Sequence, residues 1–199
     1  MSRIITIGRE FGSGGRELGK CLADELQIAY YDQEIITEIS KRTSLSEKYV
    51  QHITEHRPVM PFPIHIGRSF YTGINPMQQS YEFYRTQKDI ITEMSEKSDC
   101  VIVGRCADHI LADKNPFRIF VYADMESKMK RCRENAPEQE QMSDKELKQH
   151  IKEIDRNRSK YYEFFTEHRW GDKLNYDWCI NTTSHAIKDI VSGIAKLFQ

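Results

Sequence analysis

The sequence has little excess charge of either sign, because 29 lysines and arginines stand against 30 aspartates and glutamates, for a net charge of −1. A balanced chain has no broad basic surface, so we expect no general binding to nucleic acid. An apolar run of about 18 residues, long enough for a transmembrane helix, is also missing. The amino-terminal residues lack the apolar core of a signal peptide. We therefore expect a cytoplasmic protein that binds no membrane.

Cysteine is scarce and scattered, and no two cysteines have the spacing of a C-x-x-C pair. Five thiols spread over the chain favour buried thiols in a reducing compartment over disulfides or a zinc site. The 199 residues suit a single domain, and 39% hydrophobic residues with so little net charge exclude a disordered chain.

Short apolar runs alternate with helical patterns along the chain. Strands are expected near residues 4–7, 28–31, 100–104, 117–122 and 176–180. Helices are expected over residues 16–26, 34–42, 77–97, 124–135, from 144 to about 167, and 187–198. The apolar runs lack strict alternation, which is typical of strands buried on both faces. This pattern predicts an α/β fold in which helices cover both faces of a parallel sheet.

Three serines are expected to begin helices. Ser44 with Glu47, and Ser143 with Glu146, match the capping-box pattern, in which each side chain binds the other's backbone N–H. Ser184 is expected to cap the last helix. Two irregular segments interrupt the pattern, the proline-rich residues 58–76 and the polar loop 136–142, and we expect the first to face the substrate.

Glycines cluster between the first strand and the first helix, at Gly8, Gly12, Gly14 and Gly15, with Ser13 among them. A strand, a glycine turn and a helix aim several backbone N–H groups and a helix N-terminus at one point, which suits phosphate. Glycine allows positive φ and a close approach to the anion. We expect these five residues to hold the phosphates of a bound nucleotide, the alternative being a plain turn between strand and helix.

The cluster departs from the standard phosphate-loop pattern G-x-x-x-x-G-K-[ST]. Arg9 stands where the first glycine belongs, Gly15 replaces the lysine, and Arg16 replaces the Ser/Thr. Arg16 is expected to supply the missing charge, because a guanidinium binds phosphate in a bidentate manner, unless it is a solvated first-turn residue. Ser13 is the nearest candidate for the hydroxyl that normally ligates Mg²⁺.

Further polar residues follow other strands or lie on the long charged helix. Arg105 follows the third strand and Asp32 the second, and ligands bind at the carboxyl ends of parallel strands. Arg105 suits an acceptor phosphate. Asp32 has an equally plausible role as the N-cap of the next helix. Arg156 and Arg158 suit the charge of a transferring phosphoryl group, although residues two apart do not share a helix face, and a solvated helix face is the alternative.

Several motifs in order resemble those of the cytidylate kinase-like family, relatives of bacterial cytidylate kinases. They are IITIGREFGSGGRELGKCLADEL, YYD, VIVGR, DRNR and DWCINTTSHAIKDIV. The resemblance covers essentially the whole chain. It implies a P-loop NTPase-type three-layer α/β/α fold with a five-stranded parallel sheet in one domain, residues 1–199. A monophosphate-binding insertion would span about 33–98 and a lid about 134–160.

The resemblance also implies a function, an ATP-dependent and Mg²⁺-dependent transfer of phosphate to CMP or dCMP, a small-molecule nucleotide. Arg105 would bind the acceptor phosphate, Asp32 would lie near its sugar, and Asp177 would help to recognise the nucleoside. Arg156 and Arg158 would be lid arginines. The missing loop lysine and hydroxyl, and Cys106 where cytidylate kinases have aspartate, leave two alternatives open: a non-catalytic nucleotide sensor and a kinase of another small metabolite.

Overall fold

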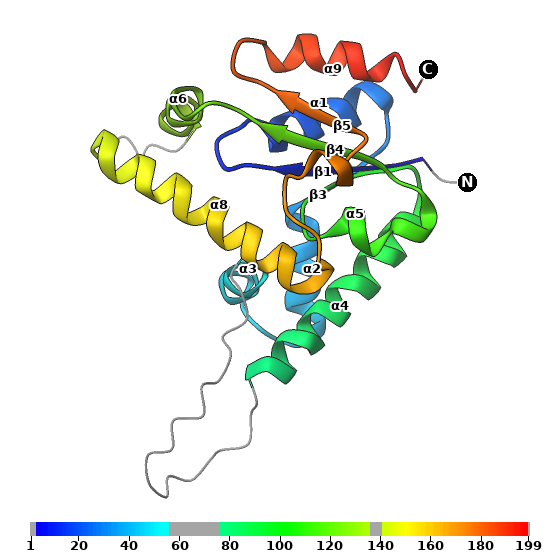
Figure 1. Ribbon diagram of the computed structural model, residues 1–199. Coiled ribbons are helices and arrows are strands. Elements are labelled where there is room, and N and C mark those ends of the chain that lie inside the picture. The colour runs from blue at the N-terminus through cyan, green and yellow to red at the C-terminus, as the bar shows by residue number, and fades with distance from the viewer. Residues whose placement is uncertain (1–2, 56–75, 136–140, 199) are drawn as a thin grey trace, which may run out of the picture.

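A single parallel sheet organises the computed structural model, which describes residues 3–55, 76–135 and 141–198 (Figure 1). Its strands are β1 (Ile4–Arg9), β2 (Ala29–Tyr31), β3 (Cys100–Val103), β4 (Phe117–Tyr122) and β5 (Trp178–Asn181). Across these residues the strand order is β2-β3-β1-β4-β5, and every pairing is parallel. β1 is central because it pairs with both β3 and β4. The expected parallel sheet is confirmed.

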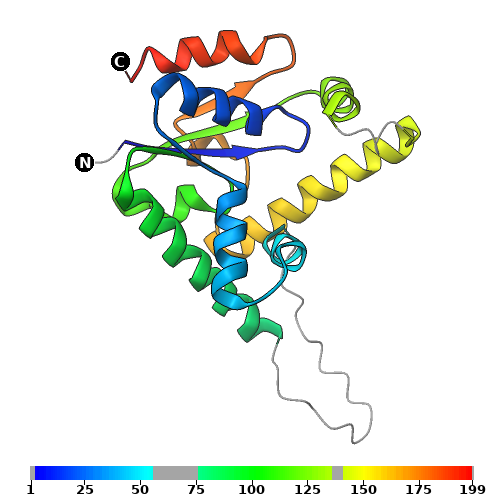
Figure 2. The ribbon, with the colours of Figure 1, turned by 180° about the vertical axis from the view of Figure 1, so that it is seen from behind.

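Helices cover both faces of the sheet, as the lack of strict alternation predicts (Figures 1 and 2). One face carries α1 (Gly15–Leu26) and α9 (Ile187–Ala195). The other carries α2 (Gln33–Thr43), α4 (Pro76–Lys97) and α5 (Ala107–Ile110). Successive side chains of β1 point to opposite faces of the sheet. Ile5 and Ile7 pack against α1 and α9, and Ile4 packs on the other face.

A third group of helices lies beyond the carboxyl ends of the strands: α3 (Glu47–Glu55), α6 (Met125–Asn135) and α8 (Asp144–Thr166). The long helix α8 packs Leu147 and Ile151 with Cys132 of α6. Further along, it packs Tyr161 and Tyr162 on Cys106, which follows β3. α8 therefore extends across the sheet's carboxyl edge, where ligands of parallel sheets bind.

The helix boundaries agree with the expected ranges, but two of the three predicted caps are wrong. Ser143 forms its capping box with Glu146. Ser44 instead ends α2 in a left-handed conformation, with φ 56°, and Glu47 begins α3 with its carboxylate accepting a hydrogen bond from Thr37. Ser184 caps nothing, because α9 begins after Ala186 with no side-chain cap.

Three short elements were not expected: α5 and the 3₁₀ turns η1 (Ala112–Lys114) and η2 (Lys173–Asn175). They are too short for a periodic pattern to mark them. Of the expected irregular segments, 58–75 and 136–140 lie outside the described residues, and Pro76 begins α4.

All five cysteines fall within the described residues and none forms a disulfide, as expected, but only Cys100, Cys106 and Cys132 are buried. Over the same ranges no helix combines the length and the apolar character needed to cross a membrane.

We predict that Ser143→Ala lowers the free energy of unfolding by about 1 kcal/mol, because it removes the hydroxyl that accepts the Glu146 N–H. Ser184→Ala is the matched control and should change stability by less than about 0.5 kcal/mol, because the exposed Ser184 caps no helix. Urea denaturation of the three proteins measures both values. Equal losses in the two variants would contradict the assignment of the caps.

Candidate functional site

The glycine-rich loop, residues 10–14, connects β1 to α1 and is fixed from both sides. Gly12 and Gly14 have φ of 73° and 80°, the left-handed region that favours glycine. Ser13 between them is fully buried, and its hydroxyl donates to the Glu10 carbonyl at 2.8 Å. Its own carbonyl accepts from the Thr182 hydroxyl at 2.6 Å. The loop therefore presents the N-terminus of α1 in a fixed orientation.

A cleft of about 950 Å³ opens over this loop, and we call it the loop cleft. Gly12, Gly14 and Gly15 are among its lining residues. The cations that line it are Arg9, Arg16, Lys20, Arg131 and Arg158. Glu10, Glu17, Asp32 and Glu34 also line it. Its size suits a nucleotide whose phosphates lie at the α1 N-terminus, where the backbone N–H groups favour an anion.

Asp32 orients Arg16 and does not cap α2. It occupies the N-cap position of that helix, but its side chain makes no capping hydrogen bond. Its Oδ2 lies 2.5 Å from Nε of Arg16, and its Oδ1 lies 4.0 Å from Nη2 of Arg9. The Arg16 side chain remains 60% exposed, so its guanidinium lies along the cleft wall.

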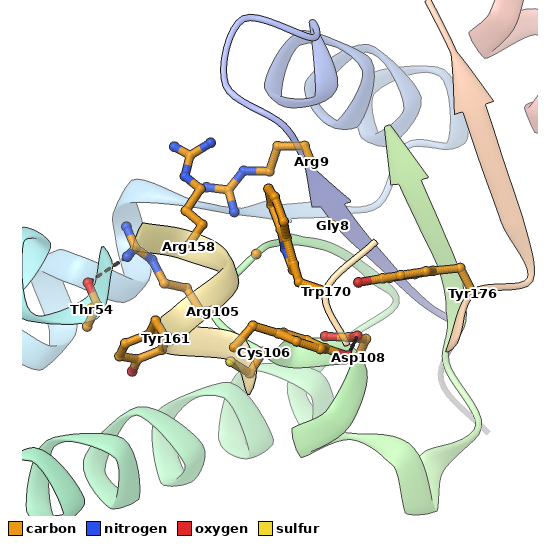
Figure 3. Close-up of a pocket in the computed structure, with 12 residues that line it drawn as sticks. Gly8, Arg9, Thr54, Arg105, Cys106, Asp108, Arg158, Tyr161, Trp170 and Tyr176 are labelled. Carbon is orange, nitrogen blue, oxygen red and sulfur yellow. Dashed lines mark hydrogen bonds between the residues drawn. The ribbon is translucent and has the colours of Figure 1, made fainter. Parts of the chain in front are cut away.

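A smaller cavity of about 40 Å³, which has no room for a whole nucleotide, adjoins the loop cleft at Arg9 and Arg158, and we call it the inner cavity (Figure 3). Its lining residues are Gly8, Arg9, Thr54, Gly104, Arg105, Cys106, Asp108, Arg158, Tyr161, Tyr162, Trp170 and Tyr176. Three arginines reach it from three different elements: β1, the turn after β3, and α8. Figure 3 shows their side chains around the cavity, with Trp170 beside them.

A strained turn directs Arg105 into the inner cavity. Arg105 and Cys106 have φ of 58° and 55°, a conformation that costs non-glycine residues about 1 kcal/mol or more. Two hydrogen bonds hold the turn. Nη1 of the buried Arg105 donates to the Thr54 hydroxyl at 2.5 Å, and its carbonyl accepts from the Gln87 side chain at 2.9 Å. Backbone strain of this kind concentrates at functional sites.

Asp108, Tyr162 and Cys106 also line the inner cavity, and burial affects their protonation. Burial raises the pKa of Asp108, against the lowering effect of the hydrogen bond that its carboxylate accepts from the Tyr162 hydroxyl at 2.7 Å. Burial also raises the pKa of the Cys106 thiol well above its ordinary value. Cys106 is therefore a neutral packing residue, because the thiolate is the nucleophilic form.

Arg156 and Arg158 lie on different faces of α8, as residues two apart on a helix must. Arg158 lines both the loop cleft and the inner cavity, and its guanidinium lies 5.5 Å from the centre of the Phe11 ring. Arg156 is exposed and lines neither.

A buried ammonium joins the loop to α6 and α8. Nζ of Lys128 lies 2.6 Å from Glu10 Oε2 and 2.8 Å from Asp155 Oδ2, with only 5% of its side chain exposed. The other carboxylate oxygen of Asp155 accepts the backbone N–H of Phe11 at 2.6 Å. Burial lowers the pKa of Lys128, but its hydrogen bonds to Asp155 and Glu10 outweigh that effect and raise it overall. Lys128 thus stays charged and fixes α8 to the loop.

Two predicted residues lie away from both cavities. Asp177 immediately precedes β5, at the opposite edge of the sheet, where it binds Arg118 with Oδ1 3.0 Å from Nη2. The Ser13 hydroxyl, already bonded to Glu10, does not line the loop cleft and does not fit the role of a Mg²⁺ ligand. Within the described ranges, no group of three or more His, Cys, Asp and Glu side chains could hold a metal ion.

Sequence reasoning missed several residues of the site. Arg9 stood out in the sequence only as a departure from the motif, and Arg131, which donates to the Thr182 carbonyl, was not predicted as a site residue. Asp155 belongs to the DRNR motif, in which only the arginines have the charge to bind phosphate. No sequence signal marked Asp108 or Lys128, because tertiary packing brings them to the site.

The glycine loop before α1 and the all-parallel sheet define the fold of the P-loop kinases. The sequence profile of the cytidylate kinase-like family matches residues 4–184, and the chain belongs to this family. No curated protein matches the sequence.

Solved structures agree on the fold. An uncharacterized protein from Eubacterium ventriosum is 29% identical, with a TM-score of 0.70 over 98% of this chain and 97% of that chain. Shikimate kinase from Bacteroides thetaiotaomicron is 16% identical, with a TM-score of 0.59 over 100% of this chain and 99% of that chain. The shikimate kinase from Acinetobacter baumannii, solved in complex with shikimate, is 15% identical, with a TM-score of 0.55 over 100% and 93% of the two chains. Family and fold together support a small-molecule kinase.

We predict that Lys128→Met lowers the free energy of unfolding by about 2–3 kcal/mol, because it removes the cation shared by the Glu10 and Asp155 carboxylates, which are themselves partly exposed. Lys130→Met on the same helix is the matched control, since Lys130 is exposed and should cost less than about 0.5 kcal/mol. Urea denaturation of both variants gives the comparison. A loss below about 1 kcal/mol for Lys128→Met would show that the buried pair contributes little.

Proposed function

We propose that this protein is an ATP-dependent kinase that phosphorylates a nucleoside monophosphate, with CMP or dCMP as the acceptor. One observation carries the proposal: the cationic cleft over the glycine loop and the arginine-rich inner cavity share Arg9 and Arg158 among their lining residues. A donor in the loop cleft and an acceptor whose phosphate enters the inner cavity would bring their phosphates together there. The family and the fold support the same reaction.

The loop cleft would bind the donor. Backbone N–H groups of Gly12, Gly14 and Gly15 would hold the ATP phosphates with the α1 dipole. Arg16, oriented by Asp32, would contact the terminal phosphate from the cleft wall. Mg²⁺ would neutralise phosphate charge, but we assign it no protein ligand and derive no step through it.

The inner cavity, of about 40 Å³, would bind the phosphate of the acceptor and not its nucleoside. Arg105 would hold the acceptor phosphate, since the strained turn and Thr54 fix its guanidinium there. Arg158 would approach from the lid, which we assign to about residues 134–160, and residues 33–98 would supply the acceptor-binding insertion. A monophosphate oxygen is already ionised, so it needs no general base. Charge stabilisation and alignment would then account for catalysis.

A second candidate is a kinase of a small hydroxylated acid. Asp108, with the hydroxyl of Tyr162 bonded to it, could accept a hydrogen bond from a substrate hydroxyl in the inner cavity. ADP release from MgATP, measured with a panel of nucleoside monophosphates and with shikimate, separates the two candidates. ATP binding without turnover of any acceptor would favour a nucleotide sensor over both.

We predict that Arg105→Ala raises the apparent KM for the monophosphate by about tenfold or more while the KM for ATP changes less than about twofold. Arg131→Gln is the matched donor-side variant, because Arg131 lines the loop cleft but not the inner cavity. It should show the opposite pattern. Arg105→Lys guards against misfolding of the alanine variant, and equal effects on both substrates would make Arg105 structural.

We predict that Arg16→Ala lowers kcat by about 10²-fold or more, because the terminal phosphate gains its charge stabilisation during transfer. Arg16→Lys should recover part of the loss, since a point charge cannot reproduce the bidentate fork. The exposed side chain should leave folding intact, and thermal melts check this. Lys20→Ala is measured in parallel, because normal kcat in Arg16→Ala with a loss in Lys20→Ala would assign the role to Lys20.

A further inference from the structure

Two arginines lie at the boundary between the two cavities. Among the lining residues of the described chain, the loop cleft and the inner cavity share Arg9 and Arg158 and no others. Arg16 and Arg131 line the loop cleft alone, and Arg105 lines the inner cavity alone. A phosphoryl group that passes from one cavity to the other must therefore pass Arg9 and Arg158.

The structure around Arg9 is shaped for its side chain. Arg9 is buried at the end of β1, and its guanidinium lies against Gly104 so closely that a Cβ atom there would overlap it. A Cβ on Gly15 would likewise overlap the Cβ of Arg9. Two glycines from different elements thus leave the space that the arginine occupies.

Arg9 differs from the other cations in how it is held. Its backbone belongs to the central strand, which pairs with β3 on one side and with β4 on the other. Arg158 comes from α8, and Arg16 is mostly exposed on the cleft wall. A charge that must be in place before substrates bind is best attached to the most rigid element.

We infer that Arg9 is a catalytic residue that contacts the transferring phosphoryl group and takes over the role of the missing loop lysine; this inference rests on the proposed function. An acceptor phosphate oxygen forms a bond to the γ-phosphorus while the bond from that phosphorus to the β–γ bridging oxygen breaks. The electron pair of the broken bond stays on ADP, and no proton is needed. Arg9 stabilises the charge on the equatorial oxygens between the two cavities.

The test compares Arg9→Gln, Arg9→Lys and Gly104→Ala with the wild type. Arg9→Gln should lower kcat by about 10²–10³-fold, with smaller changes in both KM values, and Arg9→Lys should recover part of the loss. Gly104→Ala keeps the charge but displaces the guanidinium, so it should lower kcat as well. Normal kcat in a folded Arg9→Gln protein would overturn the inference.

Two controls separate the effect from strain and from general loss of charge. Gly171→Ala places alanine at the same φ of 73° at a position that lines neither cavity. Arg85→Gln removes an exposed arginine of α4. Neither should change kcat by more than about twofold, and thermal melts report folding of every variant.

Binding of inorganic tripolyphosphate, measured by calorimetry, tests Arg9 without turnover. Arg9→Gln should weaken this binding by about tenfold or more. If the wild type phosphorylates no acceptor, the proposed function fails, and a loss of tripolyphosphate affinity in Arg9→Gln still supports the phosphate contact. Unchanged tripolyphosphate affinity in the folded variant overturns that contact whether or not the wild type is active.

Discussion

The ammonium of Lys128 between Glu10 and Asp155 determines how the two halves of the site meet. It joins α6 to the glycine-rich loop and to α8, and Asp155 also accepts the Phe11 N–H, so the loop and α8 share one carboxylate. Because a buried ammonium is costly without a carboxylate, Lys128 is expected to keep both acids in contact with it. The contact holds α8 across the sheet edge and thereby brings Arg158 to the boundary between the loop cleft and the inner cavity.

Several arginines around one small region repel one another, and two of them donate hydrogen bonds to neutral acceptors. Arg105 donates to the Thr54 hydroxyl and Arg131 to the Thr182 carbonyl, groups that orient a guanidinium without cancelling its charge. The Asp32 carboxylate lies near both Arg9 and Arg16, and its shorter contact is with Arg16. Both cavities consequently favour anions, and the attraction should be strongest where the lining arginines are buried, because water screens them least there.

Much of the fold followed from the sequence, because hydrophobic patterns and glycine placement act locally. The strands, the parallel sheet, the longer helices and the Ser143 cap are confirmed. Ser44 and Ser184 were misplaced because a serine before a helical pattern satisfies the capping rule wherever the helix begins, and here α2 ends at Ser44 in a left-handed turn. The site was harder to predict. Lys128 and Asp108 reach it through tertiary packing, and Asp32 gave no sign in the sequence of whether it would cap a helix or bind Arg16.

Arg9 shows why a motif comparison alone misleads here. Compared with the usual loop, the chain lacks a lysine, and attention moves along the helix to Arg16. The fold offers another solution, because the end of β1 lies directly before the loop and close to the turn after β3. A long side chain from that strand reaches the boundary between the two cavities, provided that Gly15 and Gly104 leave it room. In this chain the positive charge that other loops carry on a lysine stands instead on an arginine at the end of β1. The glycine at the lysine position, Gly15, is needed because a side chain there would overlap Arg9.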